Sequence, residues 1–238
     1  MTINRADLGV AFSTGHKTLF FFDGISYRCT MFPRRKRPYT IEPQKQSLTS
    51  QKLGSNFECF FYDLDIGLRL IWYDLSALVQ VMNTMPQPKP QSDYKSCKEA
   101  IVTIHYRLVD VRYDVDSIDE ALRLALLAFS STLFVQWRGI RTRYEYLAQS
   151  FRSALSLLKR EATVLPTELS LWLYVVGIIA VFGDQEQNEV KPVLNESLQI
   201  MELKSWNDVR SSLKSILWVD MLHDPPAERM IKAILAES

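Results

Sequence analysis

The feature that most constrains the fold is an uncharged apolar run, Leu169–Phe182 (LSLWLYVVGIIAVF), which Glu168 and Asp184 bracket closely. Fourteen residues of helix extend about 21 Å, which is short of the roughly 30 Å hydrocarbon layer of a bilayer. A helix that other helices surround on every side explains the run better. We therefore predict a buried core helix rather than a membrane span, with no membrane association for the chain.

Helical spacing of apolar residues is sustained from Leu64 to about Leu235, whereas no useful run with strand periodicity follows residue 60. The 238 residues include only eight glycines, and the ten prolines fall mainly between apolar segments, as helices require. We therefore predict an all-α fold, an irregular bundle of seven to eight helices. The expected helices cover about 64–82, 93–111, 117–133, 143–161, 166–183, 186–203, 205–221 and 226–235.

Local signals mark several helix ends. Ser117 and Glu120 form the pattern of a capping box, and Ser205 with Asp208 marks a second helix start. Asp224-Pro225-Pro226 is expected to end one helix and begin the last one.

The first 50 residues differ from the rest, and we expect a basic, poorly ordered N-terminal region (1–50) before a helical domain (51–238). Residues 1–45 carry a net charge of +5, against −4 for the remainder. A hairpin around Asp23-Gly24 and a packed pair of strands remain alternatives. Prolines flank the basic run Arg34, Arg35, Lys36 and Arg37, which keeps it extended. This run predicts either a nuclear import signal or a solvated loop, so we expect a nuclear protein, with a cytoplasmic one as the alternative.

Cys29, Cys59 and Cys97 are isolated in sequence, and no Cys-x-x-Cys pair occurs. An odd number of cysteines cannot form a complete set of disulfides, so a reducing compartment fits best.

No catalytic or metal-binding constellation is predicted. His16, His105 and His223 lie far apart, and none has a second ligand at the spacing of a helical metal site. His105 is expected to be packed, and His223 to lie at a helix end. We therefore expect no cofactor and no enzymatic activity.

Other candidate sites have simpler explanations. The segment Gly15–Thr18 lacks the upstream glycine of a phosphate-binding loop. Two aspartate sets could suggest a metal, but the first lacks a glycine-bearing calcium loop and the second surrounds a helix start, where acids are expected. These sets are Asp63, Asp65 and Asp74, and Asp114, Asp116 and Asp119. Trp172, Trp206 and Trp218 are expected in the core, with the lining of a ligand pocket as the alternative.

Several segments of the second half, taken in order, resemble the fungal-specific transcription factor domain, the helical regulatory region of fungal zinc-cluster regulators. They are Glu120–Ala125, Leu171–Gly177, Ser205–Val209 and Leu213–Asp220, with Leu53–Phe57 as an earlier point of similarity. The resemblance extends over about 53–235, and its specific parts lie between 117 and 225. A zinc cluster needs six cysteines within some thirty residues, and the N-terminal region has only Cys29.

The resemblance implies a transcription-regulator-like domain that acts by binding proteins or a small-molecule effector, and it leaves a homodimer open. Because the zinc cluster is missing, it implies no specific nucleic-acid contact by this chain alone. Two alternatives remain: an enzyme or accessory protein of secondary metabolism on a helical scaffold, and the C-terminal part of a longer regulator.

Overall fold

The computed structural model describes residues 2–19, 60–84, 91–134, 144–160 and 165–237. These residues form nine helices and no strand, and a short helical turn at 60–63 precedes α3. The all-α prediction is therefore confirmed, with slightly more helices than expected. The helices are α1 (Thr2–Thr14), α3 (Ile66–Thr84), α4 (Gln91–Asp110), α5 (Ile118–Phe134), α6 (Glu145–Arg160), α7 (Thr167–Ala180), α8 (Asp184–Ile200), α9 (Trp206–Lys214) and α10 (Asp220–Glu237).

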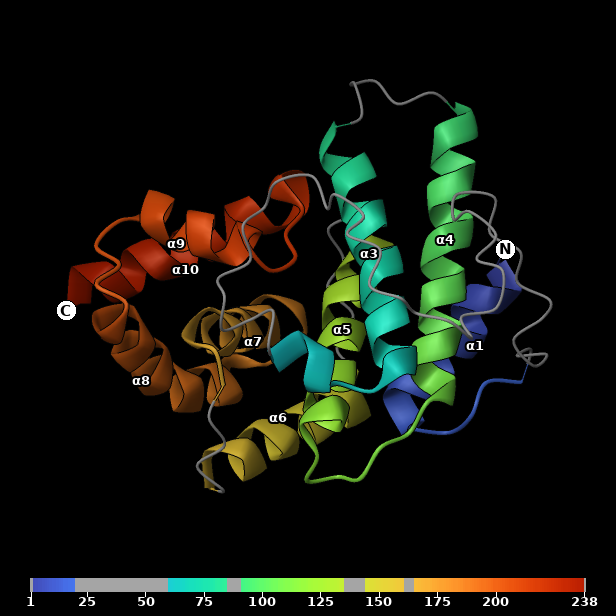
Figure 1. Ribbon diagram of the computed structural model, residues 1–238, viewed down its shortest axis with the longest axis horizontal. Helices are drawn as coiled ribbons and strands as arrows, with labels where there is room; N and C mark the ends of the chain where they lie inside the picture. The colour runs from blue at the N-terminus through green and yellow to red at the C-terminus, as the bar shows by residue number, and fades with distance from the viewer. Residues whose placement is uncertain (1, 20–59, 85–90, 135–143, 161–164, 238) are drawn as a thin grey trace.

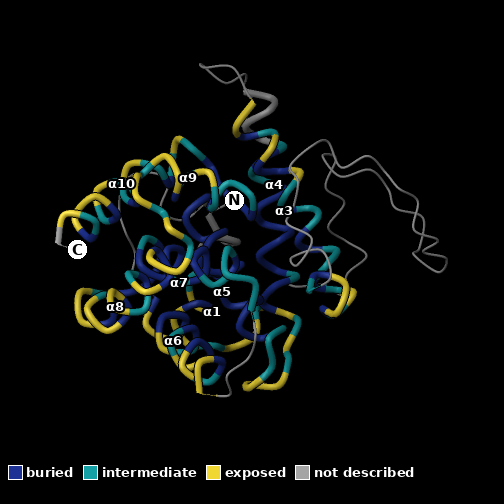
Figure 2. Tube along the Cα trace, turned by 60° about the vertical axis from the view of Figure 1, so that its left-hand side comes forward, coloured by how far each residue is buried: buried dark blue, intermediate teal, exposed yellow. Residues whose placement is uncertain are grey.

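Helices α5 and α7 form the centre of the molecule. Helix α5 packs against α3, α4, α6 and α7, while α7 packs against α5, α6, α8, α9 and α10. In Figure 1, α3 and α4 stand side by side, and α8, α9 and α10 gather at the opposite end from α1. Figure 2 shows the buried residues concentrated on the central helices and the exposed ones on the periphery.

The burial of α5 and α7 follows from their composition. Every residue of α5 from Glu120 to Leu133 is buried. Helix α7 is buried on most of its circumference, as predicted for the Leu169–Phe182 run. Among the described helices, none has both the length and the apolar content that crossing a bilayer requires.

The end of α7 depends on a glycine with no room for a side chain. The backbone N–H groups of Val181 and Phe182 both donate to the carbonyl oxygen of Gly177, at 3.0 and 2.8 Å. This turn folds the Phe182 ring back onto the helix. A Cβ atom on Gly177 would lie 2.2 Å from Cε2 of Phe182, far inside van der Waals contact. The helix consequently ends at Ala180, three residues before the end of the expected range 166–183, and Gly183 is the N-cap of α8.

Residues 2–14 correct the prediction of an irregular N-terminal region, because they form α1. The helix buries Leu8, Ala11 and Phe12 against α4 and α6. Its buried Asp7 accepts hydrogen bonds from the Tyr106 hydroxyl at 2.9 Å and from the Leu19 N–H at 2.8 Å. These three apolar positions have helical spacing, but they cover little more than one turn, which is too short a run to predict a helix from the sequence. The predicted hairpin at Asp23-Gly24 lies outside the described residues.

The C-terminal helices also differ from the prediction. We expected one helix from Ser205 to about Met221, but α9 ends at Lys214 and α10 begins at Asp220. Pro225 and Pro226 lie inside α10 instead of separating two helices. They are the sixth and seventh residues of α10, so each lacks the N–H group that would otherwise donate to the carbonyl oxygen four residues earlier, and α10 continues without these two hydrogen bonds.

Candidate functional site around His223

The described residues bring together a buried polar cluster centred on His223, near the start of α10. The side chain of His223 is 1% exposed. Its Nδ1 atom lies 3.1 Å from the backbone N–H of Val219, which donates to it. Its Nε2 atom lies 2.7 Å from the hydroxyl oxygen of Thr132 on α5.

These contacts define the protonation state of the imidazole. Because Nδ1 accepts a hydrogen bond from a backbone amide, the ring proton is on Nε2, which donates to Thr132. The Thr132 hydroxyl then donates to the carbonyl oxygen of Phe129 at 2.6 Å. Every polar atom in this chain of contacts has a partner as long as the imidazole is neutral.

Aromatic rings surround the imidazole. The ring centroids of Phe129 and Trp218 lie 4.8 and 5.0 Å from that of His223. Trp172 packs against Phe129 at 5.7 Å, and its indole N–H donates to the carbonyl oxygen of Leu217 at 2.7 Å. The core prediction for Trp172 and Trp218 is confirmed, since they are 0% and 1% exposed. Trp206 is half-buried and packs against the same core.

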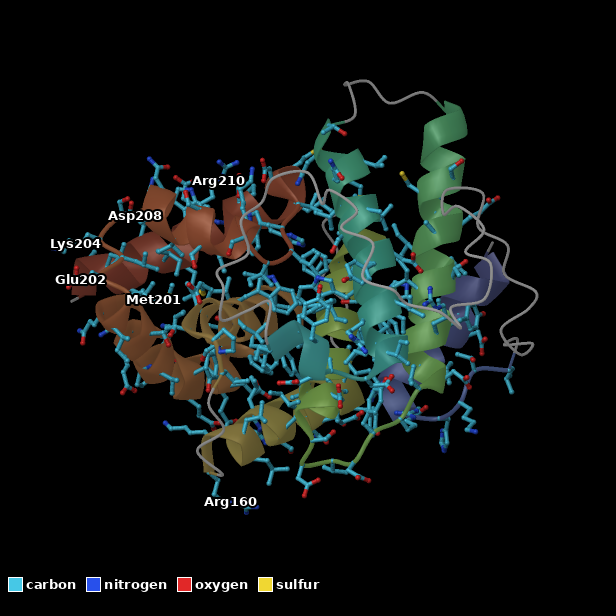
Figure 3. The ribbon with its side chains drawn as sticks, in the orientation of Figure 1. Arg160, Met201, Glu202, Lys204, Asp208 and Arg210 are labelled. Carbon is cyan, nitrogen blue, oxygen red and sulfur yellow. The ribbon has the colours of Figure 1, made fainter. Side chains whose placement is uncertain are left out.

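A shell of charged groups covers the solvent side of the cluster. The indole N–H of Trp218 donates to Oδ1 of Asp224 at 2.7 Å. Arg210 on α9 binds Asp224 and Asp220, both at 2.9 Å, and Lys214 also binds Asp220. Figure 3 shows Asp208 and Arg210 on α9, at the edge of the molecule.

The side chain of Asn83 connects this region to α3. Its amide donates to the carbonyl oxygen of Trp218 at 2.8 Å, and its oxygen accepts from the N–H of Asp220 at 3.1 Å. The segment between α9 and α10 is therefore attached to α3, α5 and α7 by side-chain contacts. This arrangement fixes the position of His223 in the core.

Burial dominates the electrostatics of both core histidines. It lowers the pKa of His223 to about 3, partly offset by the charge of Asp220. It lowers the pKa of His105 to about 3 as well, partly offset by a hydrogen bond with the backbone of Ser130. Both rings are therefore neutral at neutral pH. His105 is packed beside Phe12, as expected for a core histidine, with ring centroids 5.3 Å apart.

A second buried polar contact lies at the start of α5. The guanidinium of Arg123, which is 1% exposed, binds both carboxylate oxygens of Glu120 and donates to the carbonyl oxygen of Leu108 at 2.8 Å. The Ser117 hydroxyl accepts from the N–H of Glu120 at 3.1 Å, so one half of the predicted capping box is present. The other half is not, because the Glu120 carboxylate is bound to Arg123, and the N–H of Ser117 donates to Asp114 instead.

One aspartate from each of the two predicted sets, Asp65 and Asp119, takes part in a hydrogen bond between the sets. Oδ1 of Asp119 accepts a hydrogen bond from the N–H of Asp65 at 3.0 Å, and Asp65 accepts from the Tyr113 hydroxyl at 2.7 Å. Hydrogen bonds, that of Tyr113 first, hold the pKa of Asp65 below its usual value even though burial acts in the opposite direction. Within the described ranges, no group of three or more His, Cys, Asp or Glu side chains is placed to hold a metal ion.

Several predicted positions cannot be located. Arg34, Arg35, Lys36 and Arg37 lie outside the described residues, as do Cys29, Cys59 and the Leu53–Phe57 segment. Cys97 is buried on α4, and His16 is exposed beside Thr14.

Sequence reasoning missed Thr132, Asn83 and Arg123, which carry the polar contacts of the core. The Thr132–His223 and Asn83–Trp218 hydrogen bonds join residues 91 and 135 positions apart, so no local pattern could indicate them. The polar side chains of the core are either neutral or paired with an opposite charge, and their hydrogen bonds connect one helix to another.

In comparisons with known proteins, no family model, no curated protein and no solved structure matches this chain.

Proposed function

We propose that the chain is a transcription-regulator-like helical domain that acts by binding proteins or a small-molecule effector, without a zinc-cluster DNA-binding module of its own. The observation that carries the proposal is the position of the segments that resemble the fungal-specific transcription factor domain. The indole of Trp172, in Leu171–Gly177, donates to the carbonyl oxygen of Leu217, in Leu213–Asp220. If these segments resembled the family only because apolar helices are common, they would have no need to contact each other.

The other two segments also have structural roles. Ser205 and Asp208, in Ser205–Val209, form the complete capping box that begins α9. Arg123, in Glu120–Ala125, forms the buried ion pair of α5. Four segments separated in sequence thus supply the framework of one body. This supports reading them as one module of the regulatory type.

The buried ionisable groups favour a binding role over catalysis. His223 and Arg123 are bound to Thr132 and Glu120, and these contacts stabilise the fold. A catalytic acid or base needs a pKa near the working pH, whereas burial lowers the pKa of His223 to about 3.

A tethering experiment tests the proposal. The full chain is fused to a heterologous DNA-binding domain, and expression of a reporter behind that domain's site is measured in a fungal cell. We expect reporter expression to change at least severalfold, in either direction. Arg123→Met, which should strongly destabilise the fold, is expected to weaken the effect, and Lys232→Met, at an exposed ion pair, to retain it.

Two outcomes would contradict the proposal. One is a folded chain that leaves the reporter unchanged and is confined to the cytosol. The other is an effect that Arg123→Met reproduces in full when circular dichroism shows this variant to be unfolded. Sedimentation of the purified chain addresses the homodimer separately, because a dimer dissociates on dilution.

A further inference from the structure

An apolar and acidic surface lies where the start of α3 meets the loop between α4 and α5. Three of the large apolar side chains exposed on the described residues are here: Tyr62 (63% exposed), Ile66 (42%) and Val115 (68%). Six aspartates lie in the same stretches of chain: Asp63 and Asp65 just before α3, and Asp110, Asp114, Asp116 and Asp119 between the end of α4 and the start of α5. We call this surface the acidic corner.

Hydrogen bonds hold the two parts of the acidic corner together. Asp65, at the start of α3, binds the Tyr113 hydroxyl of the α4–α5 loop, and its N–H donates to Asp119 of α5. Tyr62 and Ile66 are therefore fixed relative to Val115, which is two residues from Tyr113. Figure 1 shows the turn at 60–63 and the start of α3 on the same side of the molecule as this loop.

The negative charge of the corner is largely uncompensated. Asp63, Asp110, Asp114 and Asp116 are exposed, and none of them forms an ion pair with a described residue. Of the nearby cations, Arg123 binds Glu120, whereas Arg112 donates to the carbonyl oxygen of Gly15, which is neutral, and so contributes one positive charge against the six aspartates.

We propose that the acidic corner binds the basic segment Met31–Tyr39 of the same chain. This segment, MFPRRKRPY, carries four consecutive positive charges between apolar and aromatic residues, Met31 and Phe32 on one side and Tyr39 on the other. The corner offers the complementary combination of unpaired carboxylates and exposed apolar side chains. Charge complementarity between exposed groups gives specificity and accelerates encounter.

The length of the chain allows the contact. Phe60 begins the turn beside the acidic corner, and it follows Arg37 by 23 residues. A chain of that length spans up to about 80 Å when extended, which exceeds the distance required within a molecule of this size. A tether also raises the effective concentration of the segment to the millimolar range, so weak exposed contacts suffice.

This inference goes beyond the proposed function and does not rest on it, because it concerns a contact within the purified chain. It adds a consequence if the basic run is an import signal. An import receptor and the acidic corner would then compete for the same four side chains, and occupancy of the corner would reduce import.

Carbodiimide crosslinking of the full chain tests the contact, because the reagent joins a lysine amine directly to a carboxylate. Lys36 is the only lysine of the segment. At about 0.05 M salt, we expect an amide link between Lys36 and Asp114 or Asp116 in the monomer, identified by mass spectrometry. At about 0.5 M salt, the yield should fall about tenfold, since exposed charges are then screened.

Two matched variants test whether the charge of the corner is responsible. Asp63→Asn with Asp110→Asn leaves the reactive Asp114 and Asp116 in place, and we expect about a threefold loss of the link. Glu196→Gln with Glu202→Gln makes the same change in net charge at exposed positions on α8 and in the turn after it, and should leave the yield unchanged.

The result can overturn the proposal in three ways. Lys36 can fail to link to the corner, or it can link equally in both variants and at both salt concentrations. In an equal mixture of isotopically light and heavy chains, links between light and heavy copies in the proportion expected for random pairing would assign the corner to a second copy instead.

Discussion

Thr132 and His223 lie 91 residues apart and share a hydrogen bond of 2.7 Å, which joins α5 to α10 inside the core. The neutral imidazole donates its only N–H to Thr132 and accepts from the backbone of Val219. This contact leads to two predictions about stability.

Thr132→Val should destabilise the fold by about 1–3 kcal/mol, because the substitution keeps the shape but leaves the buried Nε2–H of His223 without an acceptor. Urea unfolding at neutral pH measures the change. Thr103→Val is the matched control: Thr103 is also buried, but its hydroxyl donates only to Glu99 of its own helix. Equal losses from the two variants would mean that the Thr132–His223 contact contributes little.

The free energy of unfolding should fall as pH drops from 7 to 5. His105 and His223 have folded-state pKa values lowered from 6.5 to about 3, so the unfolded chain binds more protons between these values. Their contribution is therefore complete above about pH 6.5 and is lost as pH falls toward 3. The expected loss by pH 5 is about 2 kcal/mol for each histidine. Urea titrations at pH 7, 6 and 5 measure it, and a flat profile in this range would contradict the assignment of two buried neutral imidazoles.

Arg123→Met should cost about 3–5 kcal/mol, because it leaves the Glu120 carboxylate buried without its partner. Adding Glu120→Gln should recover part of this loss, since the remaining group is then uncharged. Lys232→Met, which removes the exposed pair with Glu228, should cost less than about 1 kcal/mol. Thermal or urea unfolding compares the three variants, and a small loss for Arg123→Met would show that the ion pair is not needed for stability.

Ser205→Ala should destabilise the chain by about 1 kcal/mol, with faster amide hydrogen exchange at the start of α9. The Ser205 hydroxyl accepts from the N–H of Asp208, so the substitution removes half of the capping box. Ser211→Ala in the same helix removes a hydroxyl that bonds only to Asn207, and should change stability by less than about 0.5 kcal/mol. The prediction fails if the two alanine variants are equally stable.

Replacing Arg34, Arg35, Lys36 and Arg37 together by glutamine should move the chain from the nucleus to the cytosol if the run is an import signal. Microscopy of a fluorescent fusion, large enough not to diffuse through nuclear pores, measures the distribution. Replacement of the exposed Lys159, Arg160 and Lys191 serves as a control for loss of positive charge. Nuclear accumulation that persists in the glutamine variant would exclude this run as the signal.

The sequence predicted those parts of the fold that depend on local periodicity and on neighbouring residues. The Leu169–Phe182 run indicated the buried helix α7 by its composition alone. The Ser205–Asp208 capping box was predicted correctly because both of its hydrogen bonds form within four residues.

The prediction failed where distant residues compete for the same groups. Glu120 was expected to bond back to Ser117, but Arg123 takes its carboxylate because a buried guanidinium requires a charged partner. Helix α1 was missed because its apolar pattern covers little more than one turn, and its buried Asp7 is bound by Tyr106, 99 residues away. The polar cluster of the candidate site has the same origin, since Asn83, Thr132 and His223 come from three helices.

The enclosure of α5 has a consequence for how the protein is made. Its buried residues, Glu120–Leu133, contact α3 and α4, which precede it, and α6 and α7, which follow. During synthesis, this segment is made before α7, so one of its apolar sides stays uncovered until synthesis has continued past Ala180, the last residue of α7. Nascent chains that pause in this interval are the ones that chaperones must protect, and half-molecules divided between α5 and α6 should aggregate unless both halves are produced together.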